Sequence, residues 1–169
     1  MNFENDGIDH INIYSKGKTE IGRRLSNFAF APFTLPEEGR FASIECYWYW
    51  LLLQSLDKSL YSVAVKRAEE ELRPLSGFGA KKLGRELLPK GFLYAPELQL
   101  EFRNKIKNAF CAKLNYHPEI KELLRESILP FAHYYVFNGK VINSSSHNWQ
   151  VVFWEKMRTK LKNQWSFNV

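Results

Sequence analysis

The chain has few cysteines and no residue spacing that is typical of a structural metal site. Cys46 and Cys111 are its only two cysteines, and they lie far apart in the sequence. The four histidines form no HxxxH pair, and the cysteines form no CxxC pattern. We therefore expect neither a zinc site nor a disulfide framework, and we expect a reducing compartment.

Long hydrophobic runs and nucleotide-binding glycine loops are also missing. The longest apolar run, residues 47–53, is far shorter than the roughly 20 residues that a transmembrane helix needs. The first six residues are polar and acidic, unlike a signal peptide. Residues 16–19 predict a turn and not a P-loop, because GxxxxGK[ST] is absent. We expect a cytoplasmic protein with no membrane partner and no cofactor.

The composition is that of an ordinary folded domain with a moderate excess of positive charge. The 169 residues are 45% hydrophobic and 15% aromatic, which suffices for a sizeable core in one domain spanning residues 1–169. There are 24 Lys and Arg against 18 Asp and Glu, giving a net charge of +6. This charge permits an anionic partner, such as a nucleotide, DNA or RNA, but does not require one. The composition predicts no oligomeric state.

Hydrophobic spacing, caps and turns predict a predominantly helical α+β fold with short strands and a C-terminal helix. Ser43 is placed as an N-cap, Pro118 as a first-turn proline, and Asn138-Gly139 as a hairpin turn. Short strands are expected over 11–14 and 30–35, with a turn at 37–39. Helices are expected over residues 43–56, 60–72, 81–88, 96–114, 118–125 and 149–161.

Two polar residues lie in unusually apolar sequence. Glu45 is the only charged residue between Phe41 and Asp57, and Asn27 follows Leu25-Ser26 and precedes Phe28. A carboxylate in an aromatic run is costly to bury unless it is paired or functional. We predict that Glu45 is a general acid/base and that Asn27 positions a ligand. The alternatives are a glutamate stabilised at a helix start and an asparagine that forms a turn.

Other candidates are cations and aromatic residues that suit a phosphorylated, aromatic ligand. Arg24, or its neighbour Arg23, is suited to clamp a phosphate, and Lys81 and Arg85 lie one helical turn apart. Trp48 shares the helix face of Glu45 and is suited to stack on a base. Each has a structural alternative, which is solvent exposure for the cations and core packing for Trp48.

The predicted strand unit near the C-terminus adds a third group of candidates. His133 and Tyr135 should point to one side of the strand and Tyr134 to the other. His133 is suited to shuttle a proton at neutral pH, although a histidine beside aromatic residues is more often a hydrogen-bonded core residue. Lys140 follows in the same unit, and Trp149 with Asn148 is a candidate for lining the same cleft.

The order of several motifs resembles that of the NADAR (YbiA-like) family, over nearly the whole chain. The matching segments are Ile13-Tyr14-Ser15, Gly22-Arg23, Leu25-Ser26-Asn27-Phe28, Pro32-Phe33, Ser43-Ile44-Glu45 and Ala80-Lys81-Lys82-Leu83-Gly84-Arg85. Residues 102–114 are similar to the family's next helix, and Asn148 through Met157-Arg158 loosely matches its terminal NxxGxxLMxxR helix.

This resemblance implies an α-rich fold and metal-free hydrolysis of an N-glycosidic bond. Known family activities remove ADP-ribose from guanine bases in nucleic acid or cleave a ribosylamine-type intermediate of riboflavin synthesis. Together with the residues above, it predicts a hydrolase of an ADP-ribosylated or related ribosylated base. The predicted catalytic residues are Glu45, Asn27 and His133. The predicted ligand-binding residues are Arg24, Ser26, Trp48, Lys81, Arg85, Tyr134, Tyr135, Lys140 and Trp149.

The chain also departs from the family pattern directly after the glutamate. Family members often read EHxxQxxK there, whereas this chain has Cys46, Tyr49 and Leu52 at the His, Gln and Lys positions. If the family reaction needs a lysine, Lys81 or Lys140 must supply it, the mechanism differs, or activity is lost. The rival predictions are an ADP-ribose or NAD binding module without turnover and a protein that binds nucleic acid through its basic surface alone.

Overall fold

The computed structural model describes residues 2–93, 99–143 and 147–165, and the chain divides into two compact units. Unit 1 comprises residues 1–26 and 117–169, and unit 2 comprises residues 27–116. The single domain over 1–169 stays a prediction. The predominantly helical α+β fold class is confirmed. Among the described residues, no helix is both long and apolar enough to cross a membrane.

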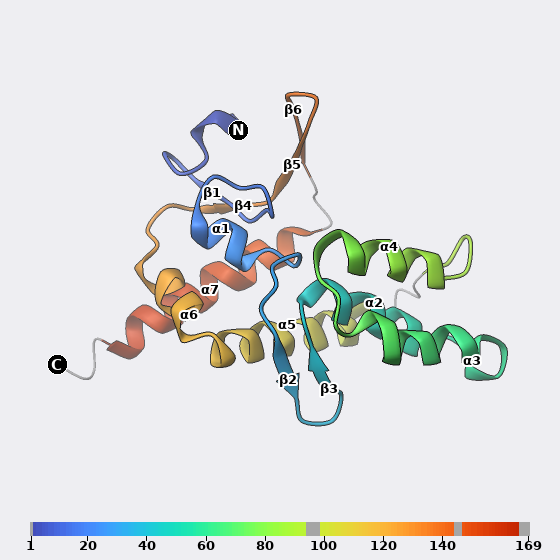
Figure 1. Ribbon diagram of the computed structural model, residues 1–169. Helices are drawn as coiled ribbons and strands as arrows, with labels where there is room; N and C mark the ends of the chain where they lie inside the picture. Colours follow the sequence, from blue (N-terminus) through green and yellow to red (C-terminus); the bar gives the residue numbers. More distant parts are fainter. Residues whose placement is uncertain (1, 94–98, 144–146, 166–169) are drawn as a thin grey trace. The chain divides into compact units, whose positions relative to one another are not determined.

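Unit 2 is built around helix α2, which makes contact with every other helix of the unit. Figure 1 shows α2 beside α4 and the β2–β3 hairpin. The elements are β2 (Phe33–Leu35), β3 (Gly39–Phe41), α2 (Ile44–Gln54), α3 (Lys58–Arg67), the π-helical turn η2 (Ala68–Leu72), α4 (Gly77–Leu87) and α5 (Gln99–Tyr116). The expected helix start over 96–98 lies outside the described residues.

An aromatic cluster forms the core of unit 2. Phe33 and Phe41 face each other in the antiparallel β2–β3 register, and both are buried. Tyr47 of α2 packs edge-on against Phe41, with 4.8 Å between ring centroids. Trp50 stacks on Tyr47 at 5.9 Å. Ser43 begins α2 as predicted, because its hydroxyl accepts a hydrogen bond from the Cys46 N–H at 3.2 Å.

Unit 1 combines three short helices and the long C-terminal helix α7 with two small strand pairs. Its elements are η1 (Phe3–Asn5), β1 (Ile11–Asn12), α1 (Glu20–Leu25), α6 (Pro118–Glu126), β4 (Phe131–Ala132), β5 (Tyr134–Phe137), β6 (Lys140–Asn143) and α7 (Asn148–Trp165). Strands β1 and β4 pair in parallel, and β5 and β6 form the predicted hairpin. Its turn residues have positive φ angles of 48° at Asn138 and 72° at Gly139, as a tight hairpin turn requires.

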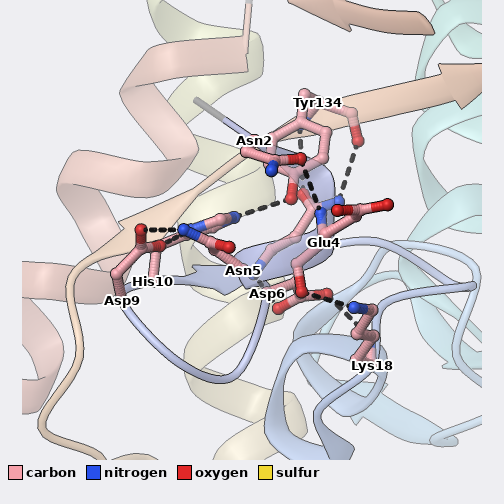
Figure 2. Close-up of polar contacts among 9 residues, drawn as sticks. Asn2, Glu4, Asn5, Asp6, Asp9, His10, Lys18 and Tyr134 are labelled. Atoms are coloured by element: carbon pink, nitrogen blue, oxygen red, sulfur yellow. Dashed lines mark hydrogen bonds and ion pairs between the residues drawn. The ribbon is translucent and has the colours of Figure 1, made fainter. Parts of the chain in front are cut away.

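A buried polar chain in unit 1 links the N-terminal segment to β5. Figure 2 shows His10 between Asp9 and Tyr134. Nδ1 of His10 donates to the Asp9 carboxylate, so its Nε2 accepts from the Tyr134 hydroxyl at 2.6 Å. Burial and the charges of Asp6 and Asp9 raise the pKa of Tyr134 to about 12, which keeps its hydroxyl a donor. This chain is therefore a structural tie between distant segments.

Candidate active site

The structure brings the two principal candidates, Asn27 and Glu45, into direct backbone contact within unit 2. The Glu45 N–H donates a 2.9 Å hydrogen bond to the Asn27 carbonyl. Glu45 is the second residue of α2, so its carboxyl group lies at the positive end of the helix dipole. The side-chain Oδ1 of Asn27 is buried and accepts no hydrogen bond from any described residue. Such an acceptor is costly and suits a ligand donor.

Burial governs the protonation of Glu45. Desolvation raises the pKa of its carboxyl group from 4.5 to about 7, while the positive charges of Lys81 and Arg85 lower it less strongly. Both protonation states are therefore populated near neutral pH. A group with this property is suited to donate a proton in one step and accept one in the next.

Helix α4 supplies the two cations that act on Glu45. Lys81 and Arg85 lie one turn apart on this helix, as predicted, and both interact electrostatically with the Glu45 carboxyl group. Burial raises the pKa of Tyr49, and the neighbouring Arg85 guanidinium opposes this effect. The Lys81 ammonium lies 5.6 Å from the ring centroid of Phe28. A carboxyl group and two cations thus converge from α2 and α4.

The rings of Phe28 and Phe78 border this cluster, and only Phe28 belongs to the Leu25-Ser26-Asn27-Phe28 motif. The Phe28 and Phe78 rings meet edge to face, with 5.3 Å between centroids. Phe78 is 70% exposed and precedes Lys81 by three residues on α4. Sequence reasoning missed Phe78, because the glycines on either side of it indicated a loop. Its spacing from Lys81 was the available signal.

Three further residues of α2 bear on the candidate site: Trp48, Cys46 and Leu52. Trp48 is half-buried, and its ring packs edge-on against Phe102 of α5 at 4.7 Å. Cys46 is fully buried, and its thiol donates to the Ser43 carbonyl at 3.0 Å. Burial raises the pKa of this thiol, so Cys46 is a small core residue, as predicted. Leu52 brings an apolar side chain where the family pattern has lysine.

Seven further predicted site residues lie in unit 1 and are described within that unit only. Arg24 pairs with Glu119 at 2.6 Å, and Ser26 is buried. Lys140 is exposed at the start of β6, and Trp149 is half-buried at the start of α7. Their ligand-binding roles stay predictions.

The remaining three of the seven surround the start of β5. His133 Nδ1 donates to the Ile13 carbonyl at 2.6 Å, and Nε2 lies 3.3 Å from the Tyr135 hydroxyl. Burial lowers the pKa of His133, which favours its neutral form. Tyr134 lies on the opposite side, as predicted, and is only 1% exposed. The Tyr134 hydroxyl already donates its one hydrogen bond to His10, so only its acceptor capacity is left for a ligand.

Among the described residues, no group of three or more His, Cys, Asp or Glu side chains is arranged to hold a metal ion. No protein-family model matches this chain. No curated protein and no solved structure matches it either. The resemblance to the NADAR family stays a prediction that rests on the quoted motifs.

Proposed function

We propose that this protein hydrolyses the N-glycosidic bond between ADP-ribose and a nucleobase. The observation that carries the proposal is the Glu45 carboxyl group, whose pKa burial raises to about 7, on a residue whose backbone N–H donates to the Asn27 carbonyl. Two cationic side chains that are suited to bind phosphate, Lys81 and Arg85, act on the same carboxyl group. This combination matches the needs of a ribosyl substrate that carries a diphosphate.

In the proposed reaction, Glu45 acts first as an acid and then as a base. Protonated Glu45 gives its proton to the base nitrogen while the bond from that nitrogen to the ribose carbon breaks. The bonding electron pair leaves with the base. The Glu45 carboxylate then takes a proton from the attacking water, whose oxygen forms the new bond to the ribose carbon. One water is consumed, and Glu45 returns to its protonated state.

The surrounding residues bind and orient the substrate in this proposal. Lys81 and Arg85 bind the diphosphate, since both are cations on one face of α4. The buried Oδ1 of Asn27 accepts a hydrogen bond from a ribose hydroxyl. Phe78 offers an exposed ring against which a purine can stack. Guanine in nucleic acid is the favoured base, because the net charge of +6 suits a polyanion.

A binding module that recognises ADP-ribose without turnover is the second candidate. The observation that favours it is the composition of α2, where buried Cys46 and apolar Leu52 replace the family's histidine and lysine. In that case Lys81, Arg85 and Asn27 bind the nucleotide, and Glu45 does not complete a reaction. Release of the base separates the two candidates.

The decisive experiment follows ADP-ribose release from a guanine-ADP-ribosylated DNA oligonucleotide by mass spectrometry. The parent is expected to release ADP-ribose, and Glu45→Gln is expected to release it at least about a hundredfold more slowly. Glu37→Gln, which replaces an exposed carboxylate in the β2–β3 turn, is the matched control. If the parent binds ADP-ribose but does not release it from the oligonucleotide, the result supports the binding module. A ribosylamino pyrimidine of the riboflavin pathway is tested in parallel as the alternative substrate.

A further inference from the structure

A hollow in unit 2 is lined in part by the chain segments that adjoin Asn27 and Glu45. It is an open pocket of about 370 Å³, a size within the range of small-ligand sites. It is lined by Phe30, Pro32, Arg40, Ala42, Arg73 and Pro74. The proposed reaction uses none of these residues.

Backbone hydrogen bonds hold the three walls of this pocket together. The Ala31 N–H donates to the Ala42 carbonyl at 3.1 Å, and the Ala42 N–H donates to the Arg73 carbonyl at 3.0 Å. The Arg73 guanidinium lies 4.5 Å from the ring centroid of Phe41 and pairs with Glu69. The pocket is therefore a preformed feature, and the charge of Arg73 is already neutralised.

The pocket offers one exposed aromatic ring and one unpaired cation. Phe30 is 64% exposed, although large aromatic side chains are usually buried. Arg40 is exposed and forms no ion pair or hydrogen bond in the part of the chain that the structure describes. Its β-register places it opposite Thr34, so its side chain leaves the hairpin on the face opposite buried Phe41. An aromatic platform beside an arginine is typical of single-stranded nucleic acid binding.

We infer that this pocket binds a nucleotide next to the modified base in a single-stranded nucleic acid. The neighbouring base stacks on Phe30, and Arg40 binds the adjoining phosphate. Phe30 follows Asn27 by three residues, and a chain of that length spans about 10 Å at most. The inference rests on the proposed function. It also deepens that function, because a site for a neighbouring nucleotide makes the substrate a polymer and not a free nucleotide.

Charge distinguishes this pocket from another hollow of unit 2. A pocket of about 390 Å³ is lined by residues of α2 and α5 together with Glu38, Ser55 and Lys58. There Glu38 pairs with Lys105 at 3.5 Å, and Glu101 adds another carboxylate. That mixture of charges disfavours a polyanion, whereas the pocket at Phe30 and Arg40 has no carboxylate in its lining.

Fluorescence anisotropy with an unmodified, fluorescein-labelled 12-nucleotide DNA single strand tests the inference without any reaction. We expect Phe30→Ala to weaken binding about tenfold, which corresponds to the loss of one stacked base. We expect Arg40→Gln to reduce the slope of log affinity against log salt by about 0.7, as one lost phosphate contact requires. Leu60→Ala and Lys66→Gln, two exposed positions on α3, are the matched controls and should bind like the parent.

A second arm compares hydrolysis of the ADP-ribosylated oligonucleotide with that of ADP-ribosylated guanosine. Phe30→Ala and Arg40→Gln should raise KM about tenfold for the oligonucleotide and leave KM for the nucleoside unchanged. If the parent binds the strand through both residues but releases no ADP-ribose, the proposed reaction fails and the nucleotide site stands. If the parent does not bind the strand, or both variants bind it like the parent, the inference is overturned, whatever the hydrolysis shows.

Discussion

Gly84 of α4 lies so close to Tyr49 of α2 that a Cβ at position 84 would be 2.1 Å from the Tyr49 Cγ. Cβ atoms in proteins essentially never approach a non-bonded heavy atom of another residue within 3.0 Å. The absence of a side chain at Gly84 therefore sets the spacing of the two helices. One helix carries Glu45, and the other carries Lys81 and Arg85, so this contact also sets the geometry of the candidate site.

Gly84→Ala should destabilise the protein by about 1–3 kcal/mol, because the added methyl group forces α2 and α4 apart. It should also lower ADP-ribose release, since the cations move away from Glu45. Chemical denaturation measures the first effect. Gly79→Ala on the same helix is the control, because its Cβ would meet only Leu75 at 3.8 Å. That change should be neutral or stabilise by up to about 1 kcal/mol. Equal stability of both variants would contradict the packing argument.

Tyr134→Phe should destabilise the protein by about 1–2 kcal/mol. The substitution removes the hydroxyl that donates to His10 at 2.6 Å and leaves a buried ring nitrogen without its donor (Figure 2). Urea denaturation measures the change in unfolding free energy. Tyr116→Phe is the control, because Tyr116 is 56% exposed and removal of its hydroxyl should change the free energy of unfolding little. If both variants unfold alike, the polar chain does not stabilise unit 1.

Local signals predicted much of the fold. The Ser43 cap, the first-turn Pro118 and the Asn138-Gly139 turn each act through neighbouring residues, and the structure has all three where expected. Helix α1 was missed, although Thr19 caps it by accepting from the Gly22 N–H at 3.1 Å. Helix α4 begins at Gly77 and not at Lys81, because contacts with the rest of unit 2 outweigh the low helix propensity of its glycines.

Contacts between distant segments could not be predicted in this way. The parallel β1–β4 pair joins Ile11 to Phe131, and its two-residue strands carry too weak a pattern to indicate a partner. At the candidate site, apolar surroundings singled out Asn27 and Glu45. The hydrogen bond that joins them depends on tertiary packing.

The protonation of Glu45 predicts an unusual loss of stability as pH rises. Its pKa is about 7 in the folded protein against an ordinary 4.5, so the unfolded chain loses the proton first. The free energy of unfolding should fall by about 3 kcal/mol, mostly between pH 4.5 and 7, and then level off. Glu45→Gln should remove this fall.

Denaturation at several pH values, with the parent and Glu45→Gln side by side, measures the difference directly. The stability advantage of Glu45→Gln over the parent should grow between pH 4.5 and 7 and stay constant above that range. Glu37→Gln should follow the parent's profile, because this carboxylate is exposed. Parallel curves for the parent and Glu45→Gln would show that Glu45 titrates normally.

Lys81→Gln should raise the pKa of Glu45 above its present value of about 7, because the Lys81 charge opposes the effect of burial. A single cation near a partly solvated carboxyl group contributes on the order of 1 kcal/mol, which corresponds to somewhat less than one pH unit. Carboxyl-carbon NMR of labelled glutamate follows the titration, with Glu45→Gln identifying the signal. Lys82→Gln, on the exposed side of the same helix, should leave the titration midpoint of Glu45 where it is.

In the proposed reaction, the alkaline limb of the pH–rate profile should move to higher pH with Lys81→Gln, because Glu45 stays protonated to higher pH. A titration midpoint that does not respond to Lys81 would separate this cation from the carboxyl group and remove it from the candidate site.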